Sequence, residues 1–173
     1  GPEAGAAANG PQPLPGPVDE VLNLLGELAR AVLGPDGDAR LAEGLSFLRR
    51  RLTGDYEVDL FGFDRELTDT VLLPLLRPLY RYWFRGETRG AENLPADGPA
   101  LVVANHSGSI PLDSLMTQVA VNDSTERHLR MLGADLVFQM PIVADIARRS
   151  GTTLACNEDA VRLLTAGELV GVW

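Results

Sequence analysis

The sequence contains no lysine, and all 15 of its basic residues are arginine. A Schiff-base lysine and the lysine of a phosphate-binding P-loop are therefore excluded. One cysteine and two histidines exclude an internal disulfide and are too few for a tetrahedral Cys/His zinc site. We accordingly expect no metal and no cofactor.

Long apolar runs and an excess of positive charge are also missing. No run of about 18 apolar residues occurs, so no segment is expected to cross a bilayer as a helix. The formal net charge of −9 argues against nucleic acid as a partner, because such binding depends on clustered Lys and Arg. The start of the chain lacks the basic-then-apolar order of a signal peptide, and a single cysteine is typical of a reducing compartment. These features predict a cytoplasmic location.

The first 60 residues divide into a tail and two helical patterns. Residues 1–17 are rich in Gly, Pro and Ala and are expected to be disordered, with Gly1-Pro2 resembling the remnant of a cleaved tag. From Val18 onward, apolar residues at helical spacing predict a helix that ends at Gly34-Pro35. A second helix is predicted by Leu41, Leu45, Leu48 and Leu52, with Gly54 closing it. We expect these helices to form an antiparallel hairpin within residues 18–60, ahead of a main domain at 61–173.

A third helical pattern runs from Asp64 to Arg85, and Pro74 and Pro78 are expected to kink or break it. Its arginines recur every four residues and form a basic stripe, while leucines and aromatic residues supply apolar surface. This composition is typical of a helix at an anionic membrane surface, and it equally fits a core helix with a solvated arginine face. The residues expected to contact a membrane under the first reading are Arg77, Arg81, Trp83 and Arg85.

Beyond this helix the pattern alternates between strands and helices. Strands are expected near residues 85–89, 100–104, 129–132, 152–155 and 169–172, and helices near 111–121, 134–149 and 158–166. The run Ala100–Ala104 is apolar on both faces, which favours a place inside a parallel sheet. The fold class is therefore α/β, with a mostly parallel sheet covered by helices.

His106 directly follows a predicted strand, where ligands bind in open α/β sheets. An imidazole there can act as a general base, and Asp113 in the next helix can orient it. The alternative is a structural histidine, with Asp113 favoured by the helix dipole alone. Ser107 and Ser109 flank Gly108 without forming the G-x-S-x-G pattern of hydrolases and are expected to cap the loop.

The stretch Gly86–Pro95, the strand after it, and Asn105-His106 with Asp113 together resemble the glycerophospholipid acyltransferase family, of the lysophosphatidic acid acyltransferase type. The resemblance continues through Gly133–Pro141 and Glu158–Trp173. It implies a glycerol-phosphate acyltransferase-like fold and transfer of a fatty acyl group from acyl-CoA or acyl carrier protein to a hydroxyl of a glycerol phosphate or lysophospholipid.

The same resemblance implies roles for residues. His106 would be the general base and Asp113 its orienting carboxylate. Substrate contacts are expected from Asn105, Ser107, Gly108 and Ser109. Backbone N–H groups between Ser109 and Leu112 would stabilise the oxyanion. The implied location is peripheral, on the inner face of the cell membrane.

Two features depart from the family pattern. Six residues separate His106 from Asp113 where four are usual, and the family's third motif, Pro-Glu-Gly, would begin at residue 174. The chain is therefore expected to be the front part of an enzyme, inactive alone and prone to form homo-oligomers through uncovered apolar faces. Two other functions are considered: a non-catalytic scaffold, and a thioesterase-like hydrolase in which His106 activates water.

Overall fold

A computed structural model describes residues 23–24, 27–28, 30–31, 34–106 and 110–173 of the chain. The chain divides into two compact units, Gly1–Tyr56 and Glu57–Trp173. The expected disordered tail and most of the first expected helix lie outside the described residues, so the predicted hairpin stays a prediction.

The second expected helix is confirmed as α2 (Gly37–Thr53) in the first unit. Gly54 ends it in the left-handed region, with φ of 75°, and its N–H donates to the carbonyl of Arg50. Only glycine adopts this conformation without strain, which explains why the helix stops here. The guanidinium of Arg51 lies 4.8 Å from the ring centroid of Phe47 and 4.5 Å from that of Tyr56.

The third expected helix is present but unbroken. It consists of α3 (Arg65–Leu67), the π-helical turn η1 (Thr68–Leu72), α4 (Leu73–Pro78) and the π-helical turn η2 (Leu79–Trp83). Pro74 and Pro78 lack the N–H that an α-helix requires. The helical run nevertheless continues past both prolines, and it contains hydrogen bonds that span five residues: the N–H of Leu73 donates to the carbonyl of Thr68, and the N–H of Phe84 donates to that of Leu79.

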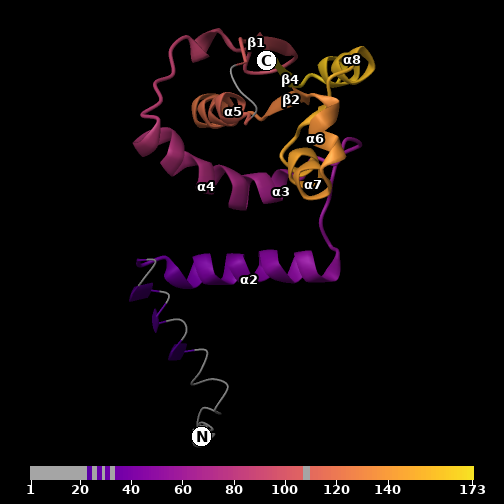
Figure 1. Cartoon of the computed structure of the whole chain (residues 1–173). Coiled ribbons are helices and arrows are strands. Elements are labelled where there is room, and N and C mark those ends of the chain that lie inside the picture. Colours follow the sequence, from indigo (N-terminus) through magenta and orange to yellow (C-terminus); the bar gives the residue numbers. More distant parts are fainter. Residues whose placement is uncertain (1–22, 25–26, 29, 32–33, 107–109) are drawn as a thin grey trace, which may run out of the picture. The chain divides into compact units, whose positions relative to one another are not determined.

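The second unit contains a four-stranded parallel sheet, which confirms the α/β class (Figure 1). Its order is β1-β4-β2-β3, and every neighbouring pair is parallel. The strands are β1 (Ala100–Val103), β2 (Leu129–Gly133), β3 (Thr153–Leu154) and β4 (Leu169–Val172). The connecting helices are α5 (Leu112–Thr125), α6 (Asp135–Gln139), α7 (Pro141–Arg149) and α8 (Asn157–Thr165). The single helix expected at 134–149 is split because Met140, which precedes Pro141, is extended.

The prediction of a strand at residues 85–89 is wrong, because these residues do not adopt a strand conformation. Arg85 has a positive φ of 49°, and the N–H of Gly86 donates to the carbonyl of Tyr80 at 2.8 Å. The hydroxyl of Tyr80 also lies 2.7 Å from that of Thr88. These contacts hold the segment against η2 in a non-strand conformation, and the short 3₁₀ helix η3 (Ala91–Asn93) follows it.

The expectation that Ala100–Ala104 is buried on both faces is also wrong. β1 lies at an edge of the sheet, and Leu101 and Val103 are 52% and 68% exposed. The other face of β1 is partly buried, because Ala100 and Val102 pack against a core cluster. Strand β1 is therefore covered by other parts of the protein on one of its two faces, and the face with Leu101 and Val103 is exposed.

Helix α5 lies between α4 and the strands of the sheet (Figure 1). A cluster of apolar side chains packs on each side of it. On one side, Met116 and Val119 pack with Leu73 and Leu76 of α4. On the other side, Val121 of the same helix packs with residues of β2 and β4, namely Leu129, Met131 and Leu169. α5 is thus held between the helical run that precedes the sheet and the sheet itself.

Arg130 of β2 is a buried charge, only 1% exposed. Its Nη1 lies 2.7 Å from Asp59 Oδ2 and 3.5 Å from Glu168 Oε1. Its Nε donates to the carbonyl of Gly151 at 3.2 Å, and its guanidinium stacks 4.5 Å from the centroid of Phe63. One side chain therefore links β2 to the segment before α3, to the start of β4 and to the start of β3.

We predict that Arg130→Met lowers the free energy of unfolding by about 3 kcal/mol, as expected when one partner of a buried ion pair is removed. Urea denaturation measures the change. Arg89→Met is the matched control, because Arg89 forms an exposed ion pair with Glu87 on the surface. Equal stability of the two variants would show that Arg130 does not hold these segments together.

Candidate active site

His106 follows β1 directly, and Asp113 stands in the first turn of α5. The N–H of Ala104 still donates to the carbonyl of Val172, so strand pairing ends just before the loop that carries the histidine. The two side chains meet: His106 Nδ1 lies 2.9 Å from Asp113 Oδ2 and 3.2 Å from Oδ1. The two extra residues in the spacing therefore do not prevent their contact.

The contact assigns the tautomer of His106. A carboxylate beside Nδ1 keeps the proton on that nitrogen, so Nε2 presents its lone pair. The imidazole is 35% exposed and the carboxylate 30% exposed, which leaves the pair open to a ligand. The N–H of Ser114 donates to Asp113 Oδ1 at 2.8 Å and fixes the carboxylate on the helix.

The start of α5 offers fewer oxyanion donors than expected. Pro111 has no N–H, and the N–H of Leu112 donates to the carbonyl of Ile110 at 2.8 Å. Ser107, Gly108 and Ser109 lie outside the described residues, while Asn105 is exposed beside the histidine.

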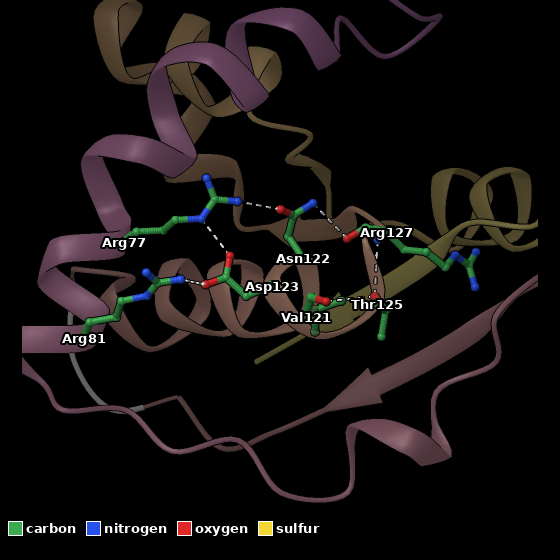
Figure 2. Close-up of polar contacts among 7 residues, drawn as sticks. All are labelled: Arg77, Arg81, Val121, Asn122, Asp123, Thr125 and Arg127. Atoms are coloured by element: carbon green, nitrogen blue, oxygen red, sulfur yellow. Dashed lines mark hydrogen bonds and ion pairs between the residues drawn. The ribbon is translucent and has the colours of Figure 1, made fainter. Parts of the chain in front are cut away.

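Of the four residues expected to contact a membrane, Arg77 and Arg81 form ion pairs within the protein. Arg77 Nε lies 2.7 Å from Asp123 Oδ1, and Arg81 Nη2 lies 2.9 Å from Asp123 Oδ2 (Figure 2). Burial alone would raise the pKa of Asp123, but hydrogen bonds and charge from both arginines outweigh it and hold that pKa below its usual value. Trp83 and Arg85 are exposed, as Arg81 is, but Arg85 forms no ion pair with the residues that the structure describes.

A polar cavity lies at the far end of α5 from Asp113, and we call it the helix-end cavity. It has a volume of about 490 Å³. Its lining is formed by Arg65, Asp69, Arg77, Arg81, Asn122, Asp123, Glu126 and His128. Sequence reasoning missed this cavity, because only the fold brings residues 65–81 beside residues 122–128.

His128 is buried in the lining of this cavity. Its Nε2 lies 3.2 Å from Asp69 Oδ1, and its ring meets the Phe63 ring edge-on at 5.1 Å between centroids. Burial lowers the pKa of His128 below its usual value and outweighs the opposing effect of Asp69. The imidazole is therefore neutral at pH 7.

We predict that this burial makes the protein less stable in mild acid. The folded state has the lower pKa, so stability is present above the pKa of about 6.5 of an unfolded histidine and is lost as pH falls below it. Denaturation curves at pH 7 and pH 5 should show a smaller pH-dependent loss in His128→Gln than in the wild type. An unchanged loss in the variant would contradict the assignment.

Within the described part of the chain, no group of three or more His, Cys, Asp or Glu side chains is arranged to hold a metal ion. None of the helices in that part is both long enough and apolar enough to cross a membrane.

In a comparison with known protein families, residues 85–173 match the family described as Acyltransferase. An uncharacterised protein of Mycobacterium tuberculosis is 51% identical over 142 residues, which cover 80% of this chain and 40% of that protein. An uncharacterised protein of Mycobacterium leprae is 53% identical over 129 residues, covering 73% and 35%. The chain thus spans about 40% of the length of the curated relatives it matches. No solved structure matches it significantly.

Proposed function

This chain belongs to the acyltransferase family, and we propose that the whole protein transfers a fatty acyl group from a thioester to a hydroxyl of a glycerol phosphate or lysophospholipid. The thioester donor is acyl-CoA or acyl carrier protein. The observation that carries the proposal is the contact of 2.9 Å between His106 Nδ1 and Asp113 Oδ2, inside the segment that matches the family.

The pair supports direct transfer without a covalent enzyme intermediate. His106 Nε2 removes the hydroxyl proton while the alcohol oxygen attacks the thioester carbonyl. A C–O bond forms, the C–S bond breaks, and the imidazolium returns its proton to the leaving thiolate. Asp113 stays ionised and stabilises the imidazolium, as the carboxylate does in other His-Asp pairs. General-base catalysis of this kind contributes about 10²–10⁴-fold.

Substrate contacts in this proposal come from Asn105 and from the loop residues Ser107, Gly108 and Ser109. All four are within three residues of His106 in the sequence, and His106 itself follows β1 at the carboxyl edge of the parallel sheet, where ligands of such folds bind.

Membrane contact in this proposal centres on Trp83 and Arg85, at a peripheral site on the inner face of the cell membrane. Both side chains are exposed, as an interfacial segment requires. Arg77 and Arg81 contribute less net attraction to an anionic surface, because Asp123 already neutralises part of their charge.

We predict that His106→Ala lowers kcat/KM for acyl transfer by the whole protein about 10²–10⁴-fold, the usual contribution of a general base. Asp113→Asn should also impair transfer strongly, because the imidazole loses its carboxylate. Thiol release from the acyl donor, measured with a lysophospholipid acceptor, reports both effects.

Asp135→Asn is the matched control for the carboxylate, since Asp135 also stands in the first turn of a helix that follows a strand. It should retain activity near that of the wild type. Activity of His106→Ala within about threefold of the wild type, far from the ~10²-fold minimum for a lost base, would rule out its assigned role.

We predict that Arg85→Gln weakens binding to anionic vesicles several-fold, since one arginine near such a surface contributes roughly fivefold in affinity. Arg77→Gln should have a smaller effect, because Asp123 neutralises part of its charge. Vesicle sedimentation measures both, with Arg162→Gln on α8 as an exposed control. Equal binding by Arg85→Gln and the control would remove residue 85 from the proposed contact.

A further inference from the structure

An apolar surface lies on the neighbouring helices α6 and α7, and we call it the α6–α7 surface. It is formed by five large apolar side chains that are between 42% and 78% exposed, namely Leu136, Met140, Ile142, Val143 and Ile146. Single exposed apolar residues are common on soluble proteins, but a group of large ones is typical of a surface that binds another protein or a membrane. The α6–α7 surface is therefore a candidate interaction surface.

This exposure follows from the way in which α7 faces the protein. Its buried residue is Ala144, which is small, whereas Ile142 and Ile146 are 78% and 55% exposed. These two isoleucines are four residues apart, so they lie one turn from each other on the same side of the helix. Helix α7 thus turns large aliphatic side chains outward, as a helix does at the boundary between water and an apolar phase.

The α6–α7 surface begins at the edge of the sheet that also carries His106. β2 ends at Gly133 and α6 begins at Asp135, while His106 lies three residues beyond the end of β1 (Figure 1). All pairs in the sheet are parallel, so the carboxyl ends of the strands meet at one edge. β4 lies between β1 and β2, and strand spacings of about 4.8 Å place the ends of β1 and β2 roughly 10 Å apart. A partner bound at the start of α6 is therefore close to the candidate active site.

The charges of α7 favour an anionic partner. The helix contains one acid, Asp145, and two arginines. Asp145 Oδ2 lies 2.9 Å from Arg149 Nε, so this carboxylate is already paired. Arg148 is exposed and forms no ion pair with the residues that the structure describes, and its guanidinium lies 4.8 Å from the ring centroid of Phe138. A cation on a long apolar stem beside aliphatic side chains suits the phosphates that border the apolar part of a membrane.

We propose that the α6–α7 surface docks on an anionic lipid bilayer. Ile142 and Ile146 insert at the boundary of the acyl chains, and Arg148 pairs with lipid phosphates. This docking turns the edge of the sheet that carries His106 toward the bilayer, where the lipid acceptor of the proposed reaction resides. The inference rests on the lipid substrates of the proposed function, and it adds a contact surface separate from the one already proposed.

Vesicle sedimentation of the whole protein tests the surface directly. The double variant Ile142→Gln/Ile146→Gln should bind anionic vesicles at least about tenfold more weakly, because burial of even one isoleucine side chain corresponds to a factor of this size. Val161→Gln on α8 is the matched control, since Val161 is also aliphatic, helical and 61% exposed, and it should bind like the wild type. All three positions are exposed, so the variants should fold like the wild type, which urea denaturation verifies. Equal binding by the double variant and the control would overturn the proposal.

A fluorescent label identifies the occupant of the surface. In a Cys156→Ser background, Ile142→Cys carries a polarity-sensitive dye, and Val161→Cys carries the same dye as the control. We expect a blue shift at residue 142 when vesicles are added and none at residue 161. A dye at residue 142 that is already blue-shifted without vesicles would show a protein segment on this surface, and a shift that depends on protein concentration would show a second copy. Either result would overturn the proposal.

The physical state of the acceptor separates this proposal from the proposed function. Ile142→Gln/Ile146→Gln should transfer acyl groups to a dispersed short-chain lysophospholipid as the wild type does, and should lose about tenfold in kcat/KM when the acceptor is embedded in vesicles. An equal loss with both acceptors would overturn the docking role. His106→Ala should lose transfer to both acceptors, yet sediment with vesicles like the wild type. Absence of acyl transfer in the wild type would refute the proposed function, and the sedimentation and fluorescence results would still decide the docking surface.

Discussion

The guanidinium of Arg130 joins segments that lie far apart in the sequence. It contacts Asp59 ahead of α3, the carbonyl of Gly151 ahead of β3, and Glu168 ahead of β4. A buried charge is costly unless it is paired, so arrangements of the strands that remove these partners are disfavoured. These contacts favour the observed register of β2 on β4, and β4 in turn pairs with β1, the strand that precedes His106. A side chain away from the carboxyl edge of the sheet thereby supports the geometry at that edge.

Helix α5 connects the candidate active site with the helix-end cavity. Its first turn carries Asp113, its middle buries Met116 and Val119 in the core, and its end carries Asp123. The apolar middle fixes the helix in place, so that Asp113 and Asp123 are held at its opposite ends. One end meets His106, and the other meets arginines from the helical run before the sheet. One helix therefore carries both the partner of His106 and a residue that lines the helix-end cavity.

Local patterns allowed much of this arrangement to be predicted from the sequence. The strands at β1, β2 and β4 follow from short apolar runs, and the nearness of His106 to Asp113 follows from a strand, a loop and a helix start. Features that depend on distant residues were not predicted. Asp123 gave no local signal as the partner of Arg77 and Arg81, because the pairing spans more than 40 residues. Residues 85–89 were expected to form a strand, but the N–H of Gly86 donates to the carbonyl of Tyr80, and no strand of the described residues pairs with this segment. The exposed face of β1 depends on sheet order, which an apolar run does not encode.

The most direct test of the proposed reaction is to identify the product that receives the labelled acyl group. A labelled acyl thioester is mixed with the whole protein and a lysophospholipid, and the products are separated by mass. We predict that the label appears in a diacyl phospholipid, with one free thiol released for each ester formed. Label recovered as free fatty acid, or a thioester that stays intact, would contradict acyl transfer to a hydroxyl.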